Sequence, residues 1–355
     1  MLRLKTALWV SGLVLVPCIS SPVCAQRYSQ TNLVSDIPGL AAFTDPNLVN
    51  PWGIAFGPTS PFWVADNGTG VSTLYLPDGT AFPPAAPLVV TIPTPPGDTS
   101  PATPTGALFN GTADFVVSEG ANSGPAAFIF TAEDGTISGW NPRVDLHNAI
   151  LKVDNSSAGA VYKGIAMGQT SNGNFLYVTN FHDNVIEMYD ASFHFVKNFT
   201  DNNLPPRFAP FGIRNINGNL YVTFARQNKK RHDDFAGPNQ GFVDVFDTNG
   251  NLLKRLISRH GLNSPWGLAV APANFGAFSN DLLVGNFGDG TISAYDPQSG
   301  EFLGSLLDQN GAVLSINGLW TITFGNLTTP NNVLFFAAGF NDEADGLFGK
   351  SQAIQ

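Results

Sequence analysis

Carboxylate and amide side chains recur in this 355-residue chain at one kind of place, directly after short runs of apolar and β-branched residues. A hard divalent cation such as Ca²⁺ takes six to eight oxygen ligands, and these side chains supply such oxygens. The candidate metal ligands are Asp66, Glu133, Asn180 and Asn286. The alternative is structural, because Asn and Asp also end strands by bonding the backbone two residues on.

A second recurring position holds a large aromatic residue directly before a glycine or a threonine. Trp52, Phe211, Trp266 and Trp320 occupy it. Ligand pockets commonly have aromatic walls with few polar groups, so these residues could stack on a sugar or another flat ligand. The alternative is that each aromatic ring fills the space between neighbouring repeats.

Histidine offers little for catalysis. Of the five histidines, His182 alone falls near the same polar strand ends. In an extended strand its neighbour Asp183 could not face it, so the sequence predicts no His–Asp pair here. The sequence also lacks a nucleophile elbow, a phosphate-binding glycine loop and a His-x-x-x-His pair. His182 is therefore a candidate ligand-binding residue, with an ordinary solvated loop as the alternative.

These positions belong to a repeat of about fifty residues. A short phrase ending in Gly, or once in Thr, recurs at intervals of 53, 58, 48, 55 and 54 residues. Its members are Gly53, Gly106, Gly164, Gly212, Gly267 and Thr321. A fixed period in this range is typical of repeat architectures. Six such units cover nearly the whole chain after residue 25, which predicts a closed ring.

Each unit contains short apolar and aromatic runs bounded by Gly, Asn, Asp and Pro, a pattern typical of strands joined by hairpins. Four runs per unit in six units predict an all-β, six-bladed β-propeller. The first strand of a blade begins, and the second ends, on the same face close to the axis. We therefore expect the polar and aromatic positions to meet in an axial funnel on that face, the top face.

The two ends of the chain suggest how the ring closes. The sixth unit offers three runs, at 319–324, 333–338 and from 346 onward, whereas 28–34 reads as an unassigned strand. Pairing 28–34 onto the last blade would complete it; the alternative is a frayed terminus. In the second unit, the innermost strand could be 105–109 or 114–118, and the sequence leaves both registers open.

Composition limits the class of protein. Residues 1–25 resemble a secretory signal, with Arg3 and Lys5 before a short apolar core, and residues 26–355 form the expected propeller domain. We therefore expect a secreted or periplasmic protein. Removing residues 1–25 leaves 15 Lys and Arg against 27 Asp and Glu, a net charge of −12, which disfavours nucleic acid as a partner. No later apolar stretch is long enough to span a membrane.

One insertion departs from the repeat. In the fourth unit, residues 226–234 place a basic run and two acids between the second and third strands. The segment could dock a partner's carboxylates or cover the top-face pocket. The alternative is a solvated loop whose charges pair among themselves.

The phrases Asn50-Pro-Trp-Gly-Ile-Ala-Phe and Ser264-Pro-Trp-Gly-Leu-Ala-Val resemble NHL repeats. The chain from about residue 28 to 350 further resembles an uncharacterised family of exported bacterial proteins, through pieces such as 128–140 and 346–349. The resemblance implies the propeller fold and no established activity. Similar six-bladed propellers include gluconolactonase-type lactonases, which hold a divalent cation in the axial funnel.

The sequence therefore predicts a binding or scaffold module of unknown ligand, with its site in the top-face funnel. The partner would be a small molecule, a glycan or a protein. The alternative is a metal-dependent hydrolase of the lactonase type that uses the same funnel with Ca²⁺ or another divalent cation.

Overall fold

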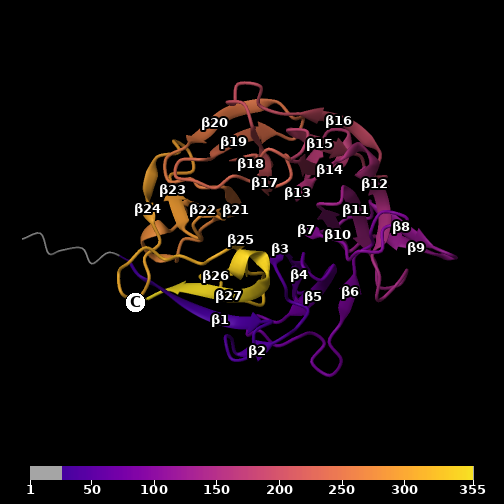
Figure 1. Ribbon diagram of the computed structural model, residues 1–355, viewed down its shortest axis with the longest axis horizontal. Helices are drawn as coiled ribbons and strands as arrows, with labels where there is room; N and C mark the ends of the chain where they lie inside the picture. The colour runs from indigo at the N-terminus through magenta and orange to yellow at the C-terminus, as the bar shows by residue number, and fades with distance from the viewer. Residues whose placement is uncertain (1–25, 355) are drawn as a thin grey trace, which may run out of the picture.

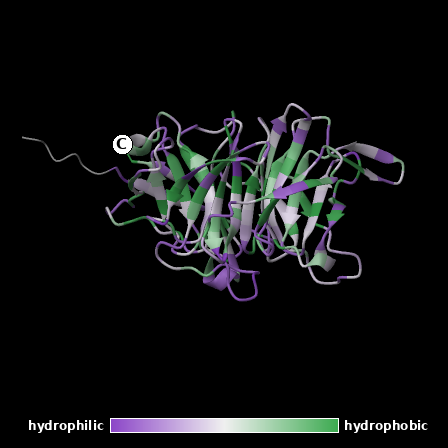
Figure 2. Ribbon diagram, turned by 90° about the horizontal axis from the view of Figure 1, so that it is seen from above, coloured by the Kyte–Doolittle hydropathy of each residue, from purple (hydrophilic) through white to green (hydrophobic). Residues whose placement is uncertain are grey.

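The computed structural model describes residues 26–354, so the signal-like segment 1–25 lies outside the described residues. Those residues form a ring of six mainly antiparallel sheets around a central axis, which confirms the six-bladed β-propeller (Figure 1). Seen from the side, hydrophobic strands make up the body of the ring and hydrophilic residues concentrate in the loops (Figure 2). No helix in residues 26–354 is long and apolar enough to cross a membrane.

The first three blades follow the repeat units in order. Blade 1 contains β3 (Pro51–Ala55), β4 (Phe62–Asp66), β5 (Val71–Tyr75) and β6 (Val89–Thr91). Blade 2 contains β7 (Pro104–Phe109), β10 (Phe128–Ala132), β11 (Thr136–Trp140) and β12 (Ile150–Asp154). Blade 3 contains β13 (Tyr162–Thr170), β14 (Gly173–Asn180), β15 (Val185–Tyr189) and β16 (Phe195–Phe199).

The last three blades complete the ring. Blade 4 contains β17 (Phe208–Ile216), β18 (Asn219–Arg226), β19 (Phe242–Asp247) and β20 (Leu252–Ser258). Blade 5 contains β21 (Pro265–Val270), β22 (Leu282–Asn286), β23 (Ile292–Tyr295) and β24 (Phe302–Ser305). Blade 6 contains β25 (Leu319–Phe324), β26 (Val333–Gly339), β27 (Asp345–Ala353), β1 (Tyr28–Ser35) and β2 (Phe43–Thr44). Short helical turns are η1 (Ser156–Ala158), η2 (Gly276–Phe278) and α1 (Phe340–Glu343).

The recurring glycine has a steric cause. A Cβ on Gly53 would lie 2.5 Å from the Thr105 carbonyl oxygen, and one on Gly267 would lie 2.7 Å from the Trp320 carbonyl oxygen. Each glycine thus marks the place where the innermost strand of one blade approaches the backbone of the next. Thr321 occupies this position in blade 6, and its hydroxyl donates to the Trp52 carbonyl at 2.6 Å. The repeat therefore records inter-blade contact at the axis.

The hydrophobic core lies between the blades, because each blade must bury both faces of its sheet against its neighbours. Within residues 26–354, six hydrophobic clusters each join two adjacent blades, and a seventh lies on the axis. The cluster between blades 6 and 1 packs Val34 and Phe348 against Phe62 and Tyr75. Hydrophobic contact between blades therefore stabilises a ring that has no cysteine after Cys24.

The N-terminal strand closes the ring, as the sequence predicted. β1 pairs antiparallel with β27, from Tyr28 opposite Ala353 to Ser35 opposite Leu347. The Tyr28 ring is fully buried against Phe275, and its hydroxyl donates to the Phe275 carbonyl at 3.0 Å. The frayed-terminus alternative is wrong, because β1 supplies the strand that blade 6 lacks.

The structure also decides the register of blade 2. Its innermost strand is β7, the 105–109 alternative. The 114–118 run instead enters a separate hairpin of β8 (Val116–Glu119) and β9 (Asn122–Pro125). Phe115 and Val117 are buried in the cluster between blades 2 and 3, so the hairpin closes the outer end of that interface.

Candidate functional site

The four predicted aromatic residues meet on the axis. Trp52 and Trp320 stack with ring centroids 3.4 Å apart, and Phe287 covers the other face of Trp320 at 3.9 Å. Trp266 meets both tryptophans edge-on, and Phe211 lies edge-on to Trp320. This axial aromatic cluster fills the middle of the ring. Because the rings cover one another, the arrangement favours packing over stacking on a ligand; Trp266 alone of the four keeps partial exposure.

A lysine replaces the aromatic residue in blade 3. Lys163 precedes Gly164 at the start of β13, so it is the counterpart of Trp52 and Trp320, and its side chain is only 2% exposed. Its ammonium lies 4.9 Å from the Trp52 ring centroid and forms an ion pair with Glu133. The sequence carried a signal for Lys163, because the other five repeats have an aromatic residue or a threonine at this position. Our sequence prediction did not include it.

A series of hydrogen bonds through side-chain amides extends this ion pair across three blades. Asn67 donates to the free Glu133 oxygen at 3.0 Å and accepts from Asn50 at 3.2 Å. Asn50 also donates to Glu343 at 2.7 Å, and its own oxygen accepts from the Trp320 indole at 3.2 Å. The chain fixes two carboxylates, Glu133 and Glu343, above the aromatic cluster.

The fourth-blade insertion reaches the side chains of Lys163, Glu133, Asn67, Asn50 and Glu343, which we call the axial group. His232 Nδ1 lies 2.7 Å from an Asp233 oxygen and 4.0 Å from Glu133. The bond to Asp233 raises the pKa of His232, and the same bond lowers the pKa of Asp233. Burial raises the pKa of the neighbouring Asp234. The insertion therefore adds one imidazole and two carboxylates to the axial group.

Only one of the four predicted metal ligands joins this axial group. Asp66 is fully buried and accepts from the Thr73 amide at 3.0 Å, inside blade 1. Asn180 donates to Glu187 at 2.7 Å, inside blade 3. Asn286 bonds the Asn263 amide and the Gly261 carbonyl. The structure therefore brings only Glu133 to the axis and does not assemble the predicted set.

The difference is a one-residue shift. Asp66, Asn180 and Asn286 are the last residues of their second strands, and successive residues of a strand point to opposite sides. The next residue of each unit, not the last strand residue, faces the axis. Those next residues are Asn67, Glu133, Phe181 and Phe287. Glu133 reaches the axis because it follows β10 rather than ending it.

The residues present do not suit Ca²⁺. Within residues 26–354, one group of His and carboxylate side chains has ligand atoms within 4.8 Å of one another: Glu133, His232 and Asp233. Its members offer one nitrogen and few oxygens, fewer than Ca²⁺ requires. In addition, the Lys163 ammonium already pairs with Glu133. A metal ion would therefore have to displace this lysine.

His182 is placed differently from the expectation. It lies 3.0 Å from Asp183 through Nδ1, with about a third of its side chain exposed. The prediction that Asp183 could not face it is wrong, because residues 181–184 form a turn rather than an extended strand. The His182–Asp183 pair lies beside blade 3. The imidazole in the axial group belongs instead to His232.

A hollow of about 370 Å³ adjoins the axial group on the top face. Its lining residues come from blades 5 and 6 and from the loop between β18 and β19 that carries the insertion: Ala236, Phe287, Gly288, Asp289, Asn317, Gly318, Gly339, Asp342 and Glu343. Glu343 belongs to both places, since it lines the hollow and bonds Asn50. The hollow is acidic, with three carboxylates and no basic side chain among these residues.

The backbone that carries Glu343 is strained. Asn341, Asp342 and Glu343 have φ values of 53°, 54° and 65°, a left-handed run without glycine. Such a conformation costs about 1–2 kcal/mol per residue. Strain of this kind persists where the surrounding structure imposes it, often at ligand sites. Burial also raises the pKa of Glu343, and the nearby Glu133 carboxylate adds to the rise.

No known family model matches this chain. Uncharacterized protein R648 of Acanthamoeba polyphaga mimivirus is 32% identical over 335 residues, covering 91% of this chain and 80% of that protein. Uncharacterized protein L690 of the same virus is 31% identical, covering 91% and 86%. The chain belongs to the family of these mimivirus proteins. The relatives do not support the expected NHL-repeat family or the bacterial origin.

Solved structures show the fold alone. A virginiamycin B lyase from Staphylococcus aureus covers 93% of this chain and all of that protein, at 15% identity and a TM-score of 0.51. A streptogramin B lyase covers 93% and 98%, at 14% identity and a TM-score of 0.54. A glucose dehydrogenase covers 91% and 98%, at 13% identity and a TM-score of 0.52. These structural neighbours agree with the propeller fold.

Proposed function

We propose that the protein is a binding module whose top-face site takes a small ligand bearing a cationic group, such as a primary amine. The observation that carries this proposal is an excess of negative charge. Four carboxylates surround Lys163 and His232 at the axis: Glu133, Asp233, Asp234 and Glu343. With all four ionised and His232 protonated, the group carries two more negative than positive charges.

The hollow beside the axis supplies space for such a ligand. Its volume of about 370 Å³ lies in the range of small-molecule sites. Phe287 forms an apolar wall, while Asp289, Asp342 and Glu343 supply charge. A bound cation would offset the burial and, secondarily, the repulsion from Glu133 that raise the pKa of Glu343. Contact with the ligand would then offset the free-energy cost of the left-handed turn.

The test compares amines with uncharged analogues by titration calorimetry at fixed ionic strength. Putrescine should bind more tightly than 1,4-butanediol, and glucosamine more tightly than glucose. Glu343→Gln keeps an oxygen for Asn50 but removes the charge, and should weaken amine binding about tenfold. Glu301→Gln, on an exposed turn of blade 5, is the matched control. Equal binding of amines and analogues would contradict the proposal.

A metal-dependent hydrolase of the lactonase type is the second candidate, favoured by the cluster of Glu133, His232 and Asp233. In this case Mn²⁺, rather than Ca²⁺, should raise the melting temperature, and His232→Ala should abolish the rise. An amine-dependent rise that survives His232→Ala would favour the binding module instead. A rise with neither probe would leave both candidates without support.

We also propose that the protein acts outside the cytoplasm, on the basis of the signal-like segment 1–25. The chain recovered from its natural source should then begin at Gln26, which N-terminal sequencing would reveal. A chain that retains residues 1–25 would contradict export.

A further inference from the structure

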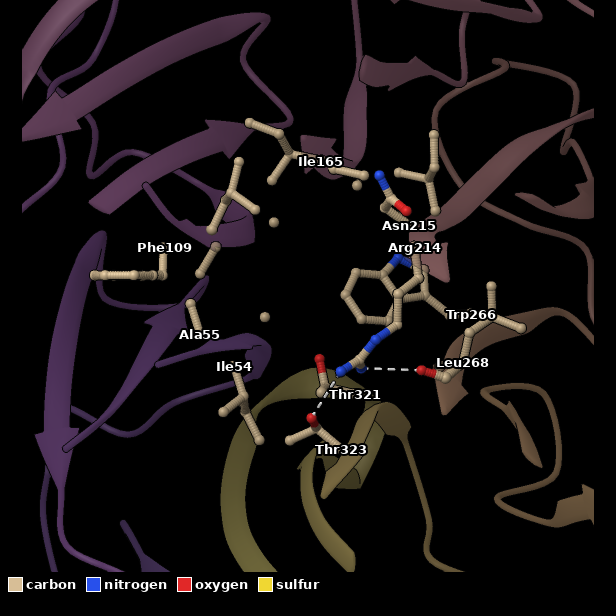
Figure 3. A pocket seen from close by; sticks show the side chains of 18 of the residues that line it. Ile54, Ala55, Phe109, Ile165, Arg214, Asn215, Trp266, Leu268, Thr321 and Thr323 are labelled. Carbon is tan, nitrogen blue, oxygen red and sulfur yellow. Dashed lines mark hydrogen bonds between the residues drawn. The ribbon is translucent and has the colours of Figure 1, made fainter. Parts of the chain in front are cut away.

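The central channel continues below the axial aromatic cluster as a separate cavity of about 300 Å³ (Figure 3). The innermost strands of all six blades line it, with apolar side chains such as Ile54, Ile165 and Leu268. Phe56, Phe109 and Asn215, near the far ends of these strands, are partly exposed, so the cavity reaches solvent on the face opposite the axial group.

One charged side chain, Arg214, stands among the residues that line this cavity. It extends from β17 in blade 4 toward blades 5 and 6, as Figure 3 shows. Nη1 donates to the Leu268 carbonyl at 3.0 Å and, weakly, to the Ile322 carbonyl at 3.4 Å. Nη2 donates to the Thr323 hydroxyl at 3.2 Å.

These bonds use three of the five guanidinium N–H groups. The Nε hydrogen and the second Nη2 hydrogen have no acceptor among residues 26–354. The Nε and Nη2 nitrogens share one edge of the planar group, and such an edge can bind two coplanar oxygens in a bidentate carboxylate pair. The bonds to blades 5 and 6 fix the guanidinium and leave this edge available.

The charges around Arg214 also favour an anionic ligand at this edge. No carboxylate in residues 26–354 forms an ion pair with Arg214, whereas Arg255 pairs with both Asp201 and Asp244. Burial lowers the pKa of Arg214, and no neighbouring acid counters this effect. The group stays charged, because guanidinium is not deprotonated in proteins. It is therefore a partly buried cation without a counter-ion among residues 26–354.

We propose that this cavity is a second binding site, distinct from the top-face site, which takes a small carboxylic acid with an apolar body. The carboxylate would bind the free edge of Arg214, and the hydrocarbon part would contact side chains such as Ile54, Ile165 and Leu268. The site is complementary to the first, since one is acidic and the other carries a single positive charge. The two lie on opposite sides of the axial aromatic cluster.

The test uses the protein from residue 26 onward and titration calorimetry with matched acids and amides. Benzoate and butyrate should bind about tenfold or more tightly than benzamide and butyramide, because charge-assisted bonds exceed neutral ones. Butyrate should also bind more tightly than acetate, since its longer chain buries more apolar surface.

Arg214→Gln should remove the preference for acid over amide, and Arg214→Lys, which keeps the charge without the planar edge, should reduce it. Arg143→Gln, at an exposed position, is the control and should behave as the parent. If the parent protein binds acid and amide equally, or binds neither, the proposal fails without reference to any variant. Retention of the full preference in a folded Arg214→Gln protein would also overturn it.

Discussion

Replacing Lys163 by Met should destabilise the protein strongly, because it leaves Glu133 without its cation. Both side chains are nearly buried, at 2% and 10% exposed. Removing one partner of a buried ion pair typically costs about 3–5 kcal/mol. The ammonium also lies 4.9 Å from the Trp52 ring centroid, so a cation–π contact is lost with it. Methionine keeps most of the apolar stem, which limits the cavity contribution.

The loss converts to a modest change in melting temperature. The entropy of unfolding is about 2.1 cal/mol/K per residue, or roughly 0.7 kcal/mol/K for a folded chain of about 330 residues. A loss of about 3–5 kcal/mol therefore corresponds to a fall of about 4–7 °C. Differential scanning calorimetry measures this fall, and urea denaturation followed by tryptophan fluorescence gives the free energy of unfolding.

A double-mutant cycle tests the reasoning. Glu133→Gln combined with Lys163→Met removes both charges, so the pair should be less destabilised than the sum of the single variants. Lys230→Met, at an exposed position in the insertion, is the control for loss of one positive charge. A Lys163→Met protein as stable as this control would refute the buried-pair interpretation. Additive single effects would also refute it, because they would show that Lys163 and Glu133 do not interact.

Three further outcomes follow from the fold. Gly53→Ala would place a Cβ 2.5 Å from a backbone oxygen of blade 2, so it should lower the free energy of unfolding in urea by about 1–3 kcal/mol. Gly237→Ala is the control, because its Cβ would meet only a flexible side chain and should change this free energy little. Tyr28→Ala should lower the unfolding free energy by about 3–5 kcal/mol, because the ring is fully buried where the chain ends join, and an unchanged urea midpoint would contradict closure by β1. Burial raises the pKa of Asp244 to about 7, against about 3.9 in an unfolded chain. Between these two pH values the folded protein binds a proton that the unfolded chain does not, so the protein loses stability as pH rises through this range. Asp244→Asn should therefore show a smaller fall in urea midpoint from pH 5 to pH 8 than the parent, and an equal fall would argue against a neutral Asp244.

The sequence by itself determined the ring. In five of the six blades a glycine lies where the innermost strand meets the backbone of the next blade, so the repeat period reflects the close approach of the strands at the axis. The closing strand was also predictable, because 28–34 had the pattern of a strand and the last unit lacked one. These features are local: each depends on the residues of one unit and on its nearest neighbours.

The composition of the candidate site was less accessible. The repeat located the axial ends of the strands, but a shift of one residue turns a side chain from the axis into the blade. Asp66 and Asn67 differ in this way, and pattern alone did not say which faced inward. The meeting of Lys163 with Glu133 depends on the exact register of blades 2 and 3, and the sequence had left the register of blade 2 open.

Only the tertiary structure brought distant segments to one place. His232 arrives on an insertion from blade 4, and Glu343 on a left-handed turn of blade 6, so no spacing in the sequence relates them to Glu133. Arg214 crosses a channel to two other blades, which its own repeat unit does not reveal. Periodic packing specifies the scaffold because every unit repeats the same contact. The charged groups break that period, and their environment exists only after the ring has closed.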